Sequence, residues 1–396
     1  MKKILIAAAA LSFTVGVAAQ GNNTGMGGSH EGCSLAERVL NLEKKSDAFN
    51  VYFNYSASFQ EFDDGNAWGS SFKNKQARIE FMGDITPKLS YRFRHRLNKG
   101  NQAQSEDNFA KATDVLSVSY RFNDKLSVQA GKMCQYWGGF EFDENPMYIY
   151  EFSDMVDRID VFMAGVNVAY RPVPTQEFTL NITDAYSNKF AEEYGEKATS
   201  LEANGNKRVL EAANHPLTYI LGWNGNFFNN VLQTRWSWGI QTQAKHKYSR
   251  MLFLGQKLNL PRLQWYFDYM GAFEGLDRVR IASQEGTDFL QGAGYFSDVH
   301  YNSFVTKMNW QFVPQWNLML KGMYETASVD NVAPMKDFRK SFGYVASVEY
   351  YPVKGEDLRV FLSYTGRKYD YSKECGLKDY NTNRIELGFM YRIKVF

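Results

Sequence analysis

The chain of 396 residues is 44% hydrophobic, 22% charged and 16% aromatic, with 45 Lys and Arg against 43 Asp and Glu. Beyond its N-terminus it contains no run of about 20 apolar residues, which excludes a helical protein with several membrane spans. Three Cys are too few for a disulfide-dense scaffold, and so many Phe, Tyr and Trp exclude a disordered chain.

The first 19 residues have the three parts of a secretory signal peptide. Lys2 and Lys3 form a basic start, residues 4–17 are apolar, and small residues precede Gln20 at the usual cleavage spacing. We expect cleavage between Ala19 and Gln20. The loss of both lysines leaves equal numbers of basic and acidic residues, so the overall charge does not favour nucleic acid as a partner.

Residues 20–47 are predicted to form a periplasmic linker with one short helix. Ser34 and Glu37 have the spacing of a capping box, and the apolar residues that follow fall on one helical face. A helix of this length is not stable alone in water. It must therefore pack on the body of the protein or on the same helix of neighbouring subunits.

From Ala48 onward, apolar and polar residues alternate, as in a sheet with one apolar and one polar face. Phe342, Tyr344 and Val348, for example, alternate with smaller or polar residues. Sixteen segments show this pattern, at approximately 48–60, 72–84, 88–98, 112–122, 125–134, 158–171, 176–187, 216–227, 231–243, 250–260, 262–274, 297–312, 315–327, 339–351, 357–370 and 383–396.

The connections between these segments alternate between tight turns and long polar loops. The long loops are expected at about 61–71, 99–111, 135–157, 188–215, 275–296, 328–338 and 371–382, and only the connection at 245–249 is unexpectedly short. Short turns on one side and long loops on the other are typical of outer-membrane barrels. The prediction is an all-β, 16-stranded antiparallel transmembrane β-barrel over residues 48–396, located in the bacterial outer membrane.

A soluble β-sandwich or propeller would also show alternation. A sandwich, however, buries its aromatic residues between two sheets. Here aromatic residues cluster near the ends of predicted strands, as at Tyr91 and Phe93 or Trp236 and Trp238. Because aromatic girdles mark both interfaces of a membrane barrel, this distribution favours the barrel.

Sixteen strands enclose an aqueous channel, so charged residues on the inward phase are candidate pore-lining groups. Arg92, Arg94 and Arg96 share one face, and facing lipid near the midplane would cost roughly 2–4 kcal/mol for each. The residues expected to line the pore and to attract anions such as phosphate or carboxylates are Arg78, Arg92, Arg94, Arg96, Arg121, Lys132, Arg235 and Lys321. The alternative is a set of arginines that only pairs with acidic loops.

The third long loop is unusually apolar and acidic for a surface loop, and it is expected to fold into the barrel and narrow the pore. The candidate constriction residues are Phe140, Glu141, Asp143, Glu144, Tyr148, Tyr150, Glu151 and Asp154. Their carboxylates would face the arginines across the pore. Anionic, cationic and weak selectivity are all compatible with that arrangement.

The segment from Gly131 to Glu141, followed by Pro146, Tyr148 and residues 153–155, resembles the phosphate-selective porin O and P family, especially its Bacteroidota members. Residues 42–52 and 78–81 resemble the same family. The resemblance covers most of the exported chain and implies a trimeric porin with an inward-folded third loop. It does not imply phosphate selectivity, because selective members have a dense set of Arg and Lys at the constriction whereas this loop is acidic.

Two functions therefore fit the sequence. The first is a water-filled channel for passive diffusion of small polar solutes, with a preference for anions such as phosphate left open. Its partners would be outer-membrane lipids and lipopolysaccharide, small polar or anionic solutes, and two further copies in a homotrimer. The second is a non-conducting structural or adhesion barrel with a closed lumen. The scattered His and Cys residues and the lack of a Gly-x-Ser-x-Gly motif lead us to expect no enzyme, no cofactor and no metal site.

Overall fold

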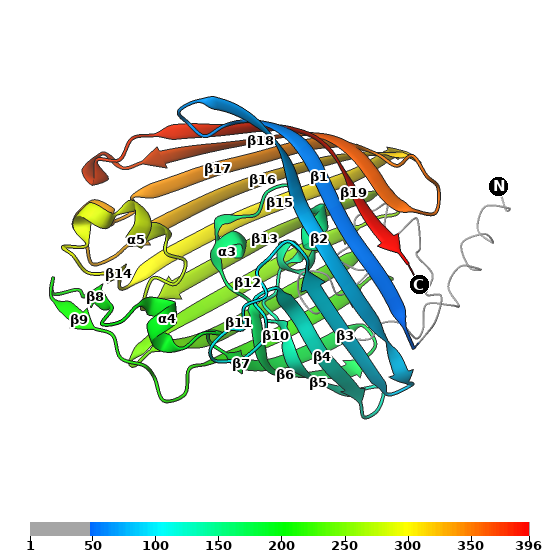
Figure 1. Cartoon of the computed structure of the whole chain (residues 1–396), viewed down its shortest axis with the longest axis horizontal. Helices are drawn as coiled ribbons and strands as arrows, with labels where there is room; N and C mark the ends of the chain where they lie inside the picture. The colour runs from blue at the N-terminus through cyan, green and yellow to red at the C-terminus, as the bar shows by residue number, and fades with distance from the viewer. Residues whose placement is uncertain (1–47, 396) are drawn as a thin grey trace.

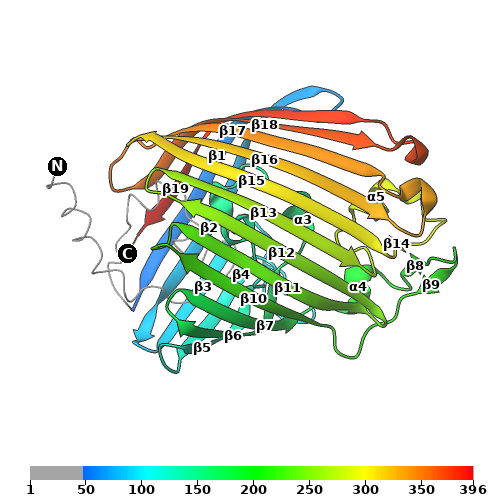
Figure 2. The ribbon, with the colours of Figure 1, turned by 180° about the vertical axis from the view of Figure 1, so that it is seen from behind.

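A computed structural model describes residues 48–395 of the chain. The predicted signal peptide and the predicted linker with its short helix lie outside the described residues. Within them, sixteen antiparallel strands form a closed barrel in which β1 pairs with β19 (Figure 1, Figure 2). The predicted 16-stranded barrel is confirmed.

The barrel strands follow one another around the wall in chain order. They are β1 Asn50–Asp63, β2 Trp68–Thr86, β3 Leu89–Arg96, β4 Thr113–Arg121, β5 Leu126–Cys134, β6 Phe162–Val173, β7 Gln176–Asp184, β10 Leu217–Phe227, β11 Leu232–Ala244, β12 Lys247–Asn259, β13 Leu263–Glu274, β15 Val299–Val313, β16 Trp316–Val329, β17 Arg339–Tyr350, β18 Asp357–Tyr371 and β19 Tyr380–Lys394. Each overlaps one segment predicted from the sequence.

The prediction of a first long loop at 61–71 was wrong. β1 and β2 continue toward each other, so that a tight turn at 64–67 joins them. Asp64 accepts hydrogen bonds from the N–H groups of Asn66 and Ala67, and Gly65 adopts a φ of 94°. Polar residues at the start of β2 hide its alternation, and the local Asp turn closes the hairpin.

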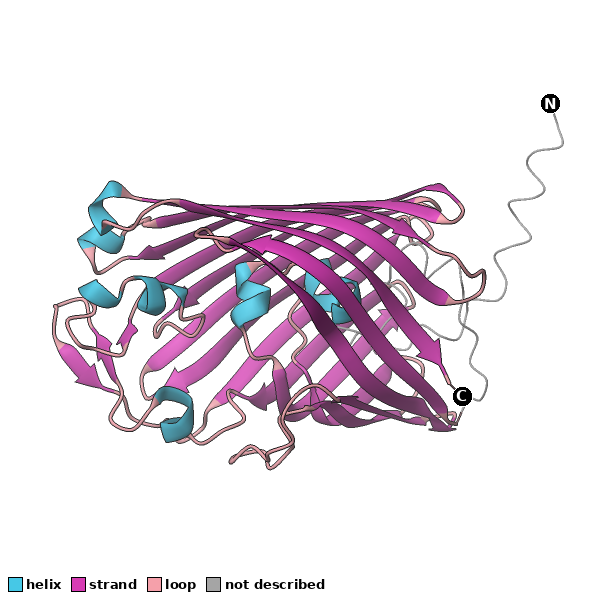
Figure 3. Ribbon diagram, turned by 45° about the horizontal axis from the view of Figure 1, so that its top comes forward, coloured by secondary structure: helices cyan, strands magenta, loops and turns pink. Residues whose placement is uncertain are grey.

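The remaining long connections carry short helices and strands, and apart from those of the third loop these lie at one end of the barrel, opposite the end where β1 begins and β19 ends (Figure 3). We call these the loop end and the turn end. The elements are α2 Phe140–Asp143, η1 Pro146–Tyr148, α3 Asp154–Arg158, α4 Phe190–Tyr194, β8 Thr199–Leu201, β9 Lys207–Val209, α5 Ile281–Glu285, η2 Thr287–Phe289, β14 Tyr295–Phe296, η3 Ala333–Met335 and η4 Lys373–Cys375. The strands β14, β8 and β9 form a small separate sheet. Among the described residues, no helix is long and apolar enough to cross a membrane.

The alternation of the sequence becomes an outer and an inner surface of the wall. On β17, Phe342, Tyr344 and Val348 are exposed on the outside, whereas Ser341 and Glu349 are buried on the inside. Successive side chains of a strand point to opposite faces of the sheet. The many polar residues of the chain thus line the inner surface of the wall, and the many aromatic residues cover its outer surface.

Candidate pore and its inward-folded loop

The third loop leaves β5, enters the barrel and returns to β6, which places α3 inside the wall (Figure 1). Two glycines let its backbone lie flat on β11. The N–H of Gly138 donates to Ser237 Oγ at 2.8 Å, and that of Gly139 to the Arg235 carbonyl at 3.1 Å. A Cβ at Gly138 would lie 2.8 Å from the Arg235 carbonyl oxygen, and Gly139 has a φ of 93°. Only glycine permits both the close approach and the left-handed backbone.

Asp268 on β13 anchors the next part of the loop. Its Oδ2 accepts hydrogen bonds from the N–H groups of Phe140 and Glu141 at 2.8 and 2.7 Å. The ring of Phe140 lies under Arg235 Cζ and Lys257 Nζ, 5.5 and 5.4 Å from the ring centroid. Asp268 was not predicted as a site residue, although its inward phase and charge in an otherwise aromatic strand were a usable signal.

The carboxylates of the loop pair with cations of the wall on which the loop packs. The pairs are Glu141 with Lys321 (2.5 Å), Asp143 with Arg235 (3.4 Å), Glu144 with Lys307, Asp154 with Arg339 (2.5 Å) and Arg367 (2.6 Å), and Glu151 with Arg384 (2.9 Å). Removing one partner of a buried pair leaves an uncompensated charge and costs roughly 3–5 kcal/mol. The pairs therefore hold the loop in one position against β11 and β15–β19.

This arrangement changes the interpretation of two predicted pore cations. Arg235 and Lys321 are buried beneath the loop in ion pairs with Asp143 and Glu141. Their predicted role as anion ligands of an open pore is not supported. The sequence could not show this, because the position of the loop on the wall depends on contacts between distant strands.

The tyrosines of the loop bind the wall at β17 and β18. The Tyr148 hydroxyl donates to Asp357, and Arg359 Cζ lies 4.1 Å from the centroid of the Tyr148 ring. The Tyr150 hydroxyl donates to Glu349 Oε1 at 2.8 Å. Both predicted constriction tyrosines thus face the wall and fix the far side of the loop.

Apolar residues of the third loop and of the loops that precede β15 and β17 fill part of the lumen toward the loop end. They join inward side chains of β4, β5, β6, β10, β12, β13, β15 and β16 in one buried cluster. Its members include Phe142, Met155, Val156, Val279, Ile281, Leu290, Phe296, Met335, Phe338, Met251, Phe253, Tyr301, Val305 and Val329. Among the described strands, the inner faces of β19, β1, β2 and β3 contribute no residue of this cluster and are polar.

A group of arginines lies on these polar strands. Asp114 is contacted by Arg78 at 3.6 Å, Arg94 at 3.4 Å and Arg96 at 2.9 Å. Asp114 reaches the lumen because a β-bulge inserts it between the residues paired with Arg94 and His95.

A second carboxylate of the arginine group lies one strand away. Glu80 is contacted by Arg92 at 2.6 Å and by Arg392 at 3.8 Å. Together with the contacts of Asp114, five guanidinium groups therefore contact two carboxylates. These seven side chains carry a net positive charge, and we call the five arginines, Arg78, Arg92, Arg94, Arg96 and Arg392, the arginine group.

Strand pairing places three members of the arginine group in one row. Arg392, Asn54, Arg78 and Arg96 lie side by side on four consecutive strands, from β19 to β3. Arg78 is only 2% exposed, and no described residue accepts a hydrogen bond from its Nε or Nη1. Asn54 and Arg392 were not predicted. The sequence does place both residues on the inward phase of their strands. These are the first and last strands, however, which become neighbours only when the barrel closes.

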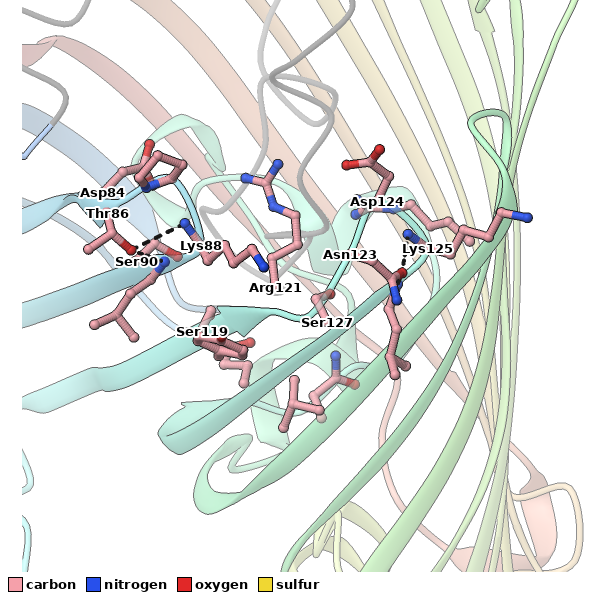
Figure 4. Close-up of a pocket in the computed structure, with 18 residues that line it drawn as sticks. Asp84, Thr86, Lys88, Ser90, Ser119, Arg121, Asn123, Asp124, Lys125 and Ser127 are labelled. Carbon is pink, nitrogen blue, oxygen red and sulfur yellow. Dashed lines mark hydrogen bonds between the residues drawn. The ribbon is translucent and has the colours of Figure 1, made fainter.

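The last two predicted pore cations lie elsewhere. Arg121 ends β4 and lines a pocket between the turns at 86–88 and 123–125, near Lys88 and Asp124 (Figure 4). Lys132 does not line the pore as predicted, because it pairs with Leu116 on the outward phase of the wall. Its Nζ is covered by the second loop, where Gln104 and Asp107 accept its hydrogen bonds at 2.7 and 2.8 Å.

A closed sixteen-stranded barrel with an aromatic outer surface, a charged lumen and an inward third loop defines an outer-membrane porin. The described residues contain no group of three or more His, Cys, Asp or Glu side chains that could hold a metal ion.

The chain belongs to the phosphate-selective porin O and P family, which it matches over residues 49–393. The predicted family and the outer-membrane location are confirmed. No curated protein matches the chain by sequence.

Solved structures share the fold at low sequence identity. The outer membrane channel DcaP of Acinetobacter baumannii superposes with a TM-score of 0.61 at 10% identity, over 89% of this chain and 99% of that one. The anion-selective porin from Comamonas acidovorans has a TM-score of 0.55 at 9% identity, over 87% and 99%. OprB of Pseudomonas putida has a TM-score of 0.54 at 11% identity, over 88% and 94%. These structures support the porin barrel, whereas the selectivity of this chain depends on its own lumen.

Proposed function

We propose that this porin is a passive diffusion channel that favours small anions, including phosphate and carboxylates. The observation that carries the proposal is the separation of charge in the lumen. The acidic third loop is paired with β11 and β15–β19, while the five arginines of the arginine group gather on β19, β2 and β3. An anion that passes these strands would therefore meet mainly guanidinium groups.

The physical basis is a lower barrier for anions. An anion that enters the lumen loses part of its hydration, and guanidinium groups replace it with charge-assisted and often bidentate hydrogen bonds. A row of such groups offers successive weak contacts, which allows an anion both to enter and to leave. The name of the porin from Comamonas acidovorans describes that protein as anion-selective, which agrees with this proposal for the same fold.

Reversal potentials in a KCl gradient across planar bilayers test the proposal. The double variant Arg78→Gln/Arg96→Gln should move the reversal potential toward cation selectivity. Arg250→Gln is the matched control, because Arg250 lies on the outer face of β12 and its loss changes the charge without touching the lumen. An unchanged reversal potential in the double variant would contradict the proposal.

A closed, non-conducting barrel is the second candidate, and the apolar cluster at the loop end is the observation that favours it. The same bilayer experiment separates the two candidates. Steady conductance steps support the channel. Repeated absence of conductance from folded wild-type protein would support the closed barrel.

We also propose that the protein is a homotrimer. The edge of β2 from Trp68 to Gln76 has no barrel partner on the side of β3 within the described residues, and Phe72 on this stretch is 85% exposed. An open strand edge with an exposed aromatic residue is typical of a surface that another chain covers. One structure with the same fold, OmpT of Vibrio cholerae, is described in a trimer form (TM-score 0.53, 11% identity). Native mass spectrometry should show a trimer, and Phe72→Glu should weaken it.

A further inference from the structure

Basic residues on the outer face of the barrel lie at one end of the wall. In the described barrel strands, the register places only Lys132, Arg250, Lys340 and Lys368 on the outward phase among all Lys and Arg. Lys132 is covered by the second loop, whereas the other three are exposed. Arg250 lies near the start of β12, Lys340 near the start of β17 and Lys368 near the end of β18. All three positions are at the loop end.

Lys340 and Lys368 form a pair on adjacent strands. Lys340 is paired with Asp370, and Lys368 with Phe342, so the two lysines are diagonal neighbours on the outer face. Diagonal neighbours in an antiparallel sheet are separated by roughly 7–8 Å between Cα atoms, and two flexible lysines can therefore contact one anionic group. Lys368 Nζ also contacts Asp370 at 2.7 Å. The three side chains together keep one positive charge.

The surface next to this lysine pair, toward the turn end, is apolar and aromatic. Phe342 and Tyr344 continue the outward phase of β17, and Tyr364 and Leu362 that of β18. The rings of Tyr344 and Tyr364 lie 5.9 Å apart. The lysines therefore lie at the boundary where the lipid-facing band ends. The apolar surface directly beside them is one on which lipid acyl chains can pack.

The opposite boundary of the wall differs. Outward positions near the turn end of β15–β17 are Phe312, Trp316 and Tyr350, and the described strands place no outward Lys or Arg there. The two leaflets of the outer membrane differ in the same way. Phosphorylated lipopolysaccharide forms the outer leaflet, and its negative headgroup attracts basic side chains at the surface. The charge of the barrel thus matches that leaflet.

We propose that Lys340 and Lys368 bind a phosphate of a lipopolysaccharide headgroup, whose acyl chains pack on Phe342, Tyr344 and Tyr364. Arg250 is a separate contact for a second lipid. The proposal rests on the outer-membrane location of the barrel, and it is independent of the selectivity of the pore.

The test compares lipid A binding by purified wild-type protein and by the variant Lys340→Gln/Lys368→Gln, measured by native mass spectrometry in detergent with EDTA present. Affinity should fall about 30-fold, which corresponds to roughly 1 kcal/mol for each lysine near a phosphate surface. The matched control is Lys125→Gln/Lys354→Gln, which removes two exposed lysines from turns at the other end. Heat-modified gel mobility verifies that every variant is a folded barrel.

Three outcomes overturn the proposal. The first is equal binding of lipid A by the wild type and the Lys340/Lys368 variant. The second is equal binding of lipid A and its dephosphorylated form by the wild type. The third is displacement of lipid A by millimolar inorganic phosphate, which identifies a general anion site instead of a lipid site. A normal reversal potential in the variant shows that the pore is unaffected, so the two proposals fail separately.

Discussion

The anchor of the third loop at Asp154 gives the sharpest test of the structure. One carboxylate oxygen of Asp154 accepts from Arg339 and the other from Arg367, at 2.5 and 2.6 Å. Both arginines keep further acidic contacts, Arg339 with Glu285 and Arg367 with Glu325. We therefore expect Asp154→Asn to weaken the anchor without leaving either arginine wholly uncompensated.

The size of the effect follows from the two lost charge-assisted bonds. A hydrogen bond to a charged group contributes roughly 1.5–3 kcal/mol, so two of them give about 3 kcal/mol as a lower figure. That free energy corresponds to an increase of about 100-fold in the population of loop-detached states, at roughly 1.4 kcal/mol for each factor of ten. The detached loop exposes the backbone of α3 to solvent.

Hydrogen exchange measured by mass spectrometry is the direct assay. Peptides that cover α3 should exchange about 100-fold faster in Asp154→Asn, and single-channel currents should become noisier. Asp157→Asn is the control on the same helix, because the Asp157 side chain is 62% exposed and, among the described residues, its one ion pair is a solvated contact with Arg158 at 3.8 Å. Equal exchange rates in the two variants would refute the anchoring role of Asp154.

The pH dependence of the anchor has a defined sign. Burial acts to raise the pKa of Asp154, but Arg367 and Arg339 outweigh it and hold the pKa below its ordinary value. A carboxyl whose pKa is depressed in the anchored state contributes its full stabilisation above its ordinary pKa and loses it as the pH falls through the depressed value. The wild-type loop should therefore stay protected down to the ordinary carboxyl range and loosen only below it.

Two further predictions concern the lumen and the loop backbone. Asp114→Asn removes a carboxylate that three arginines contact, and the reversal potential in a KCl gradient should move further toward anions; a shift toward cations would contradict the assigned charge balance. Gly138→Ala places a Cβ 2.8 Å from the Arg235 carbonyl oxygen, so proteolysis within the third loop should become faster than in Gly100→Ala, where a Cβ meets nothing within 4 Å. Equal cleavage of the two glycine variants would show that the close contact with β11 does not hold the loop.

The wall of the barrel could be predicted from the sequence because its signal is local. Each residue of a strand faces either lipid or lumen, and this choice leaves a period of two that is visible without knowledge of the neighbouring strands. The pattern was missed where both phases are polar, as at the start of β2, where Ser70 and Ser71 precede the predicted segment 72–84. The inward third loop was predicted from its apolar composition and was also implied by the family resemblance, whereas alternation alone does not show it.

The candidate site was predicted less well, because its signal is not local. The inward phase of Arg92, Arg94 and Arg96 was visible, but Asp114, which Arg94 and Arg96 contact, was not predicted to face the lumen. Asp114 reaches the lumen through a bulge, which shifts the phase by one residue. Lys132 was assigned to the wrong face, although the regular register of β5 places it on the outward phase with Val128 and Ala130. The bulge at Asp114 shows that a single irregular residue is enough to reverse the side on which a charge lies.

The chain has nearly equal numbers of basic and acidic residues, and the lumen shows how these charges are distributed. An acidic loop that faced an arginine wall would place an electric field across the pore, with hydrated ions between the two sides. Here the loop carboxylates are instead paired with a basic wall at β11 and β15–β19. That pairing removes the acidic side of the field, whereas the arginine group on β19, β2 and β3 carries more positive charges than Asp114 and Glu80 balance. Because the same contacts that hold the loop also neutralise it, loosening the loop and shifting selectivity toward cations should occur together in Asp154→Asn, whereas the Arg78→Gln/Arg96→Gln variant should shift selectivity with the loop still protected.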